Sequence, residues 1–239
     1  MLEVSLQDPA SRAVVSLMDG AIGALNTWSD QKLTRIAETT DKKKVHEMLT
    51  GNDRCFYLNS KTESGLTVLH AASEKSNYNF IEVFIKTIDT TSDKDFKTTQ
   101  RKDRSGQAFF HPHSQSPVDI NILKLIAEGL DRNNFLQIMM VEGMNKMTCL
   151  HSAIQHVQTD AIKLILEKIH VDLRHKLLNV KDTEGERPLG KLIRVMQASD
   201  DQQKEVIRLV LGLLDIERRL EIAENMLLIT YHSKNSGLI

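Results

Sequence analysis

The side chains best suited to chemistry are three histidines that recur every 40 or 41 residues, His70, His111 and His151. His113 lies close to His111, so two imidazoles could hold a metal ion, and Cys149 precedes His151 by two residues, so a thiol stands near a base. A structural zinc site needs four ligands, and a thiol nucleophile needs an oriented base and an oxyanion hole. Neither set is complete here. The sequence therefore predicts no metal site, no cofactor and no enzyme, and it favours histidines that hydrogen-bond the backbone.

The composition favours a soluble, mainly helical chain. The 239 residues carry 31 Lys and Arg against 32 Asp and Glu, and a net charge of -1 attracts neither nucleic acid nor an anionic membrane. Apolar runs end well short of the ~20 residues that cross a bilayer, and no charged-then-apolar leader opens the chain at Met1. Two cysteines, with 11 glycines and 4 prolines, favour helices in a reducing, cytoplasmic setting. We expect no nucleic-acid partner and no membrane insertion.

The histidines belong to a longer repeated pattern. Four segments share a loop, a cap and a helix start: 62–70, 103–111, 143–151 and 182–190. One apolar residue per segment, called the anchor below, recurs at spacings of 41, 40 and 39 residues: Leu69, Phe110, Leu150 and Leu189. Because the register is the same in all four segments, the sequence predicts a repeat architecture.

A second apolar cluster follows each anchor with the i, i+3, i+4 spacing of a helix face. The clusters begin 12 residues after the first three anchors and 18 after the last, at Ile81, Ile122, Ile162 and Ile207. Leu33 and Val45, also 12 residues apart, predict a fifth unit before the other four. Each unit is expected to be a helical hairpin, and the connectors around Phe96, Phe135 and Leu177 are expected to add an extra helical turn.

The second unit resembles the ankyrin repeat most closely. Gly65, Thr67, Leu69, His70 and Ala72 match the family pattern Asp-x-x-Gly-x-Thr-Pro-Leu-His-x-Ala-Ala. The resemblance covers roughly residues 27 to 215, although each copy is degenerate and its period is six to eight residues longer than the ankyrin period of about 33 residues. It implies a stack of hairpins in which no single hairpin is stable alone.

Local departures from the pattern carry their own predictions. Val68, Phe109 and Cys149 replace the proline of the pattern, and Gly190 replaces its histidine. Lys146 stands where the other units have glycine at a turn that favours positive φ, which predicts a distorted or looser turn.

Helix starts can also be located. Thr67 and Thr148 are expected to cap the helices that follow, and Pro188 is expected in a first turn, where its missing N–H costs nothing. Pro112 falls within the first helix of the third unit and predicts that this helix is short, while Pro117 falls in the next turn.

We therefore predict an all-α fold, a helical-hairpin solenoid of about five ankyrin-like repeats with helical caps and long connectors. The units span residues 27–60, 61–101, 102–141, 142–180 and 181–215. Residues 1–26 are expected to form an N-terminal helical cap, and 216–239 a C-terminal capping helix and tail. The last residues of the tail resemble the start of a further repeat, and the alternative is a polar tail that matches the pattern by accident.

The resemblance implies a protein-binding module that holds a partner on its concave face. The residues expected to line that face are Leu66, Glu74, Lys75, Arg104, Gln107, Met144, Met147, Gln155, His156, Glu186, Arg194 and Val195. Apolar residues aligned at exposed positions would mark an interface, whereas longer loops folded over them would bury them as extra core. The sequence is compatible both with an exposed interface and with extra core.

Three hypotheses about function follow from the sequence. The first is a protein-interaction scaffold in the cytoplasm. Its stretched repeats are similar in style to ankyrin effectors that intracellular bacteria deliver into host cells, which would place it in the host cytosol. The second is the substrate-recruiting part of a longer enzyme whose catalytic domain lies outside this chain. The third is a hydrolase built on Cys149 and a histidine.

Overall fold

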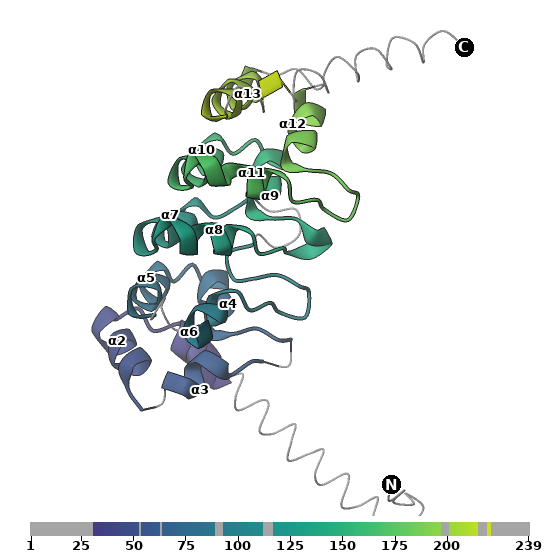
Figure 1. Ribbon diagram of the computed structural model, residues 1–239. Helices are drawn as coiled ribbons and strands as arrows, with labels where there is room; N and C mark the ends of the chain where they lie inside the picture. The colour runs from purple at the N-terminus through teal and green to yellow at the C-terminus, as the bar shows by residue number, and fades with distance from the viewer. Residues whose placement is uncertain are drawn as a thin grey trace, which may run out of the picture.

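The computed structural model is a stack of helices that rises from the N-terminal to the C-terminal part of the chain (Figure 1). It describes residues 31–52, 54–62, 64–88, 93–111, 117–196, 201–214 and 219–220. Within these ranges the secondary structure is helical, apart from a single antiparallel bridge between Lys102 and Ala108. The all-α prediction is therefore confirmed for the described residues.

One row of helices forms an edge of the stack and places its apolar faces inward. In the described part of the chain this row consists of α2 (Lys42–Thr50), α5 (Tyr78–Thr87), α7 (Ile120–Gly129), α10 (Thr159–Lys168) and α13 (Asp201–Leu213). Consecutive members contact one another, and Figure 1 shows them one above the next. The predicted second apolar clusters lie on these helices, where Ile81, Ile122 and Ile162 are all buried.

A second row pairs with the first and carries the anchors. It contains the helical residues 31–37, α4 (Val68–Glu74), α9 (Cys149–Gln155) and α12 (Pro188–Met196). Within this row α9 packs against α12, and across the hairpins α4 packs against α5 and α9 against α10. The four anchors are buried as expected, so each segment contributes an apolar side chain at the equivalent position to the core.

The third unit departs from the other units in this second row. Phe109, Phe110 and His111 lie in a turn, although Phe110 is still buried. The short helix predicted around Pro112 is not seen up to His111, and residues 112–116 lie outside the described part. Pro117 precedes α7 in non-helical backbone, as its position in the predicted turn requires.

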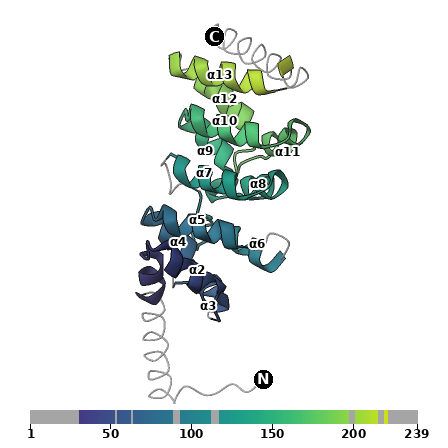
Figure 2. The ribbon, with the colours of Figure 1, turned by 90° about the vertical axis from the view of Figure 1, so that its left-hand side faces the viewer.

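The long connectors each contain a third helix, which confirms the predicted extra helical turn. These helices are α3 (Arg54–Asn59), α6 (Asp93–Thr99), α8 (Arg132–Met139) and α11 (Arg174–Leu178), the last preceded by the 3-10 turn η2 (Val171–Leu173). Figure 2 shows α3, α6, α8 and α11 along one side of the stack. Phe96, Phe135 and Leu177 are buried, so the added residues extend the hydrophobic core.

Polar side chains determine where several of these helices begin. The carboxylates of Asp119 and Asp131 accept hydrogen bonds of 2.8 Å from backbone N–H groups in the first turns of α7 and α8. Thr67 and Thr148 occupy the N-cap positions of α4 and α9, as predicted. α12 begins at Pro188, in agreement with the sequence.

The predicted terminal caps lie outside the residues that the structure describes. Residues 1–26 lie outside the described residues, and so does 216–239 apart from 219–220. Among the helices that are described, none is both long and apolar enough to span a membrane.

Candidate functional site

The loops that precede the second-row helices share one hydrogen-bonded frame. We call them fingers one to four: residues 62–66, 103–107, 143–147 and 182–186. In each, the N–H of the first residue donates to the carbonyl oxygen of the fifth at 2.7 to 2.9 Å, and the N–H of the fourth donates to the carbonyl oxygen of the first. The fingers therefore present equivalent positions to solvent at each level of the stack.

The fourth residue of each finger has a left-handed backbone conformation. Gly65, Gly106 and Gly185 have φ between 78° and 82°, as predicted, because glycine alone enters this region without a Cβ clash. Lys146 takes the same place with φ 57°, and Asn145 before it also has φ 57°. Finger three is therefore distorted as expected but not looser, since both closing hydrogen bonds are retained.

Neighbouring fingers are joined to one another. The N–H of Arg104 donates to the carbonyl oxygen of Ser64 at 3.0 Å, and the N–H of Thr183 donates to that of Asn145 at 2.9 Å. Fingers two and three are joined through a side chain instead, because Gln107 Oε1 accepts the N–H of Met144 at 3.3 Å.

Each of the three repeated histidines joins the start of its own unit to backbone in the next finger or just before it. His151 Nδ1 accepts the backbone N–H of Thr148 at 3.2 Å, so the proton of the neutral ring is on Nε2, which donates to the carbonyl oxygen of Glu186 at 3.3 Å. His111 makes the equivalent bonds to Ala108 and Val141. These contacts confirm that the rings hydrogen-bond the backbone.

Burial keeps these imidazoles neutral. It lowers the pKa of His111 from the ordinary 6.5 to about 4, more than its hydrogen bond to Val141 raises it. The pKa values of His70 and His151 are lowered for the same reason. The histidines therefore hold the units in register and offer no base for catalysis near neutral pH.

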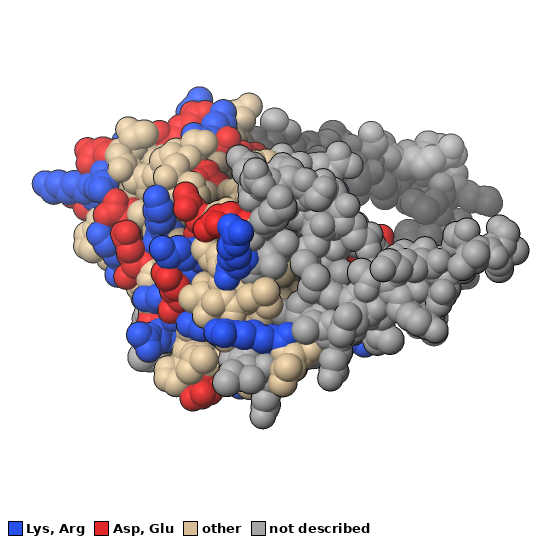
Figure 3. Space-filling view, turned by 90° about the horizontal axis from the view of Figure 1, so that it is seen from above, with Lys and Arg blue, Asp and Glu red and all other residues tan. Residues whose placement is uncertain are grey.

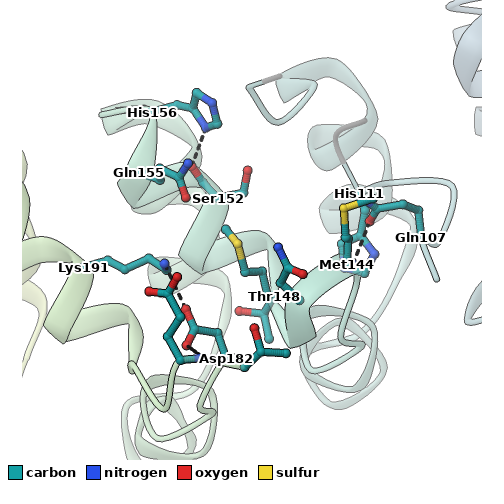
Figure 4. Close-up of a pocket in the computed structure, with 13 residues that line it drawn as sticks. Gln107, His111, Met144, Thr148, Ser152, Gln155, His156, Asp182 and Lys191 are labelled. Carbon is teal, nitrogen blue, oxygen red and sulfur yellow. Dashed lines mark hydrogen bonds and ion pairs between the residues drawn. The ribbon is translucent and has the colours of Figure 1, made fainter. Parts of the chain in front are cut away.

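A cavity of about 310 Å³ lies between fingers three and four and helix α9 (Figure 4). The residues that line it come from three successive units: Gln107, His111, Met144, Asn145, Met147, Thr148, Ser152, Gln155, His156, Asp182, Thr183, Glu184 and Lys191. Ligand sites in proteins begin at about this size, and a cavity this small suits one long side chain better than a large ligand.

A charged cluster forms one wall of the cavity. The ammonium group of Lys191 lies 2.9 Å from a carboxylate oxygen of Asp182 and 3.5 Å from one of Glu186. Burial alone would raise the pKa of Asp182, but the Lys191 ammonium and the N–H groups of Glu184 and Glu186 bring it below its ordinary value. Asp182 is therefore ionised at neutral pH.

The same wall offers carboxylates that a metal ion could use. Carboxylate oxygens of Asp182, Glu184 and Glu186 lie within 4.8 Å of one another. Lys191 already supplies a positive charge between two of them, so the geometry is that of an ion-pair cluster.

Five of the residues predicted to contact a partner meet at this cavity. They are Gln107, Met144, Met147, Gln155 and His156, which the sequence drew from two successive units. Glu186 lies beside the cavity through its ion pair with Lys191.

The remaining predicted contact residues do not line the cavity. Glu74 and Lys75 are exposed at the end of α4, where Lys75 lies 3.2 Å from Glu38, and Arg104 is exposed on finger two. The side chains of Arg194 and Val195 lie outside the described part of the structure.

The side chains predicted to be exposed differ in their actual exposure: Met144 is exposed and Gln107 is buried. Met144 is 38% exposed, whereas Met147 and Leu66 are half-buried. The connectors therefore do not cover Met144 as extra core. Gln107 was expected on the exposed face but is only 6% exposed, because its side chain turns toward finger three and bonds Met144.

The lining residues that were not predicted as partner contacts include His111, Thr148, Ser152 and Asp182. Ser152 could have been found, since it lies three residues before Gln155 and hence on the same helix face. Asp182 repeats the position of Asp103, and in both residues the carboxylate accepts a hydrogen bond from an N–H of its own finger, so the repeated position by itself indicates a turn and gives no sign of a cavity.

The thiol suggested by the sequence is unsuited to nucleophilic attack. Cys149 is fully buried, and burial raises the pKa of its thiol to about 12. Its Sγ lies 3.6 Å from the carbonyl oxygen of Phe110. His113 lies outside the described residues.

Comparison with known proteins adds no identification. No protein-family model matches the chain, and no curated protein matches it either.

Proposed function

We propose that the protein is a solenoid of divergent ankyrin-like repeats that binds a partner protein on the face formed by fingers two to four and helix α9. The repeated finger geometry and the histidine contacts support the repeat assignment. The observation that carries the binding proposal is the cavity of about 310 Å³, which gathers five residues selected from the sequence as partner contacts.

The chemistry of this face suits protein recognition. Met144 offers an exposed, flexible thioether, and Met147 lies beside it with partial exposure. Methionine adapts to irregular partner surfaces, and interfaces place such apolar groups inside a polar rim. Here Gln155, Thr183 and Glu184 supply exposed polar groups around the two methionines.

On the face of the stack seen from above, no single sign of charge marks a surface for a charged partner. Figure 3 shows Lys and Arg interspersed with Asp and Glu over the described part of the face seen from above. Interspersed charges cancel beyond the Debye length of about 8 Å at physiological salt. Recognition on this proposal is therefore local to the cavity.

Affinity capture with matched variants tests the proposal. The double variant Met144→Glu, Met147→Glu places two charges on the face, while Val171→Glu places one at an apolar residue that is 46% exposed on η2, away from the cavity. Proteins retained from a eukaryotic lysate by the wild type and by Val171→Glu should be lost from the double variant. Equal retention by all three proteins would disprove binding at this face.

Thermal unfolding controls for damage to the fold. Because Met144 is exposed and Met147 half-buried, the double variant should unfold within a few degrees of the wild type. A large loss of stability would mean that the methionines belong to the core.

A further inference from the structure

Two buried polar groups that line the cavity have no partner among the described residues. Ser152 is 5% exposed, its hydroxyl makes no hydrogen bond to any residue in the described ranges, and Figure 4 shows its side chain at the cavity. Gln107 is 6% exposed, and Oε1 is identified as its oxygen because it accepts the Met144 N–H. The Nε2 group of Gln107 then has hydrogens to donate and no acceptor within the described part.

Such groups are uncommon in folded proteins, because a buried donor or acceptor without a partner is costly. The two groups belong to different units and stand on different walls of one cavity, with Ser152 on α9 and Gln107 on finger two (Figure 4). An occupant that satisfies both must present a hydrogen-bond acceptor to the Nε2 group of Gln107, while the hydroxyl of Ser152 can either donate a hydrogen bond or accept one.

The lining also has an excess of negative charge. Asp182 and Glu184 contribute two carboxylates and Lys191 the single ammonium group of the lining. Burial leaves His111 neutral near pH 7, and the other lining imidazole, that of His156, donates through Nδ1 to the carbonyl oxygen of Ser152. A cationic occupant complements this balance, and an anionic occupant would be repelled.

The remaining wall is apolar and fits a methylene chain. Met144 and Met147 line the cavity beside the polar groups, and thioethers pack readily against flexible aliphatic chains. Arginine combines such a chain with a planar group that has five N–H donors, so it can serve a carboxylate and a hydroxyl at once, which the ammonium of lysine does less well.

We propose that the cavity receives an arginine side chain of the partner protein. Its methylenes lie against Met144 and Met147, its guanidinium donates to Glu184 and to Ser152 Oγ, and the Nε2 group of Gln107 donates to a carbonyl oxygen of the partner backbone. This assignment rests on the proposed function and specifies the partner chemistry at the same site.

The test uses small probes and the methionines as reporters. The full chain is labelled with ¹³C at the methionine methyl groups, and Met144→Leu and Met147→Leu each remove one signal and so assign it. The probe is Nα-acetyl-arginine N-methylamide, which carries the guanidinium and two amide carbonyls. The control probe is the corresponding citrulline derivative, which has the same length and no charge.

The arginine probe should shift the Met144 and Met147 signals with a dissociation constant on the order of a millimolar, as expected for so small a ligand. The citrulline probe should bind about tenfold more weakly, since it lacks charge-assisted hydrogen bonds. Glu184→Gln should weaken arginine binding several-fold and leave citrulline binding unchanged. Glu184 is exposed, so this variant should retain the fold.

Three outcomes would overturn the assignment: no shift of either signal at saturating probe, equal binding of the two probes, or shifts confined to other methionines. A cavity that holds water alone would give the first of these. Affinity capture separates this proposal from the broader one. Loss of partner capture in the methionine variant without an arginine response leaves partner binding standing and removes arginine, whereas an arginine response with unchanged partner capture removes partner binding at this face.

Discussion

The Nε2–H group of His70 donates a 2.9 Å hydrogen bond to the carbonyl oxygen of Gln107, 37 residues further along the chain. The Nδ1 atom of the same ring accepts the backbone N–H of Thr67 at 3.2 Å. One imidazole thus orders the start of its own helix and ties it to the next finger. Stacking register is therefore specified by hydrogen bonds as well as by hydrophobic contact.

Replacing His70 should weaken the link between two units. His70→Ala removes both hydrogen bonds. The N–H of Thr67 loses its acceptor and the carbonyl of Gln107 keeps only the N–H of Asp103, so the free energy of unfolding should fall by about 2 to 4 kcal/mol. Urea unfolding followed by circular dichroism measures the loss. His46→Ala, at an exposed position on α2, should change stability by less than about 0.5 kcal/mol. Similar losses in the two variants would contradict this role for His70.

The buried histidines should make the fold sensitive to acid. The pKa of His111 falls from 6.5 in the unfolded chain to about 4 in the fold, so between these values the unfolded state binds a proton that the folded state excludes. The free energy of unfolding should therefore decrease as the pH is lowered from about 6.5 to 4, by up to about 3 kcal/mol for His111 alone. Urea titrations at several pH values measure this slope.

Two observations separate the histidine contribution from that of carboxylates. His111→Gln removes the titrating group and should flatten the slope between about pH 4 and 6.5. Asp182, whose pKa is lowered, loses its stabilising contribution only as the pH falls below about 4. An unchanged slope in His111→Gln would show that this ring is not the source.

The finger turns allow backbone strain to be separated from steric contact. Gly106 has φ 79° and open space around it, so Gly106→Ala should cost about 1 kcal/mol from conformation alone. A Cβ atom at Gly65 would also lie 2.9 Å from the backbone nitrogen of Arg104, so Gly65→Ala should cost more. Lys146→Gly should stabilise the protein by about 0.5 kcal/mol, since it relieves φ 57° at a non-glycine residue. Thermal unfolding ranks the three variants, and equal costs for the two alanine variants would disprove the contact at Gly65.

The hydroxyl of Ser152 should contribute to binding of the arginine probe and should not contribute to the stability of the fold. Because it is buried without a partner in the described part, Ser152→Ala should leave the free energy of unfolding unchanged or raise it by about 1 kcal/mol. The same substitution should weaken binding of the arginine probe several-fold. Urea unfolding and methionine-methyl spectra provide the two measurements. A clear loss of stability would mean that the hydroxyl has a structural partner.

Much of the local structure could be predicted because it depends on short stretches of sequence. Thr67 and Thr148 lie at N-caps since a side-chain oxygen beside a helix start is favoured there, and Gly65 has positive φ since only glycine avoids a clash. The anchor Leu69 was found from its spacing to Leu150, and the core confirms that both are buried.

The site was predictable only in part, because a cavity depends on how three units are offset in space. Gln107 was expected to be exposed, yet its amide turns inward to meet Met144, 37 residues away. Ser152 was not predicted as a site residue, because a small polar residue on a helix is common and indicates no particular role. Its importance comes from burial without a partner, which no spacing reveals.

The sequence by itself determined the helices, their N-caps, the finger turns and the regular placement of the buried anchors. Each of these follows from local sterics, hydrogen bonding and hydrophobic periodicity. Only the tertiary structure decided that Met144, Ser152 and Lys191 line one cavity and that the amide of Gln107 turns inward to meet Met144. The physical reason is that packing joins residues from different units, and burial and charge then depend on neighbours far away in the chain.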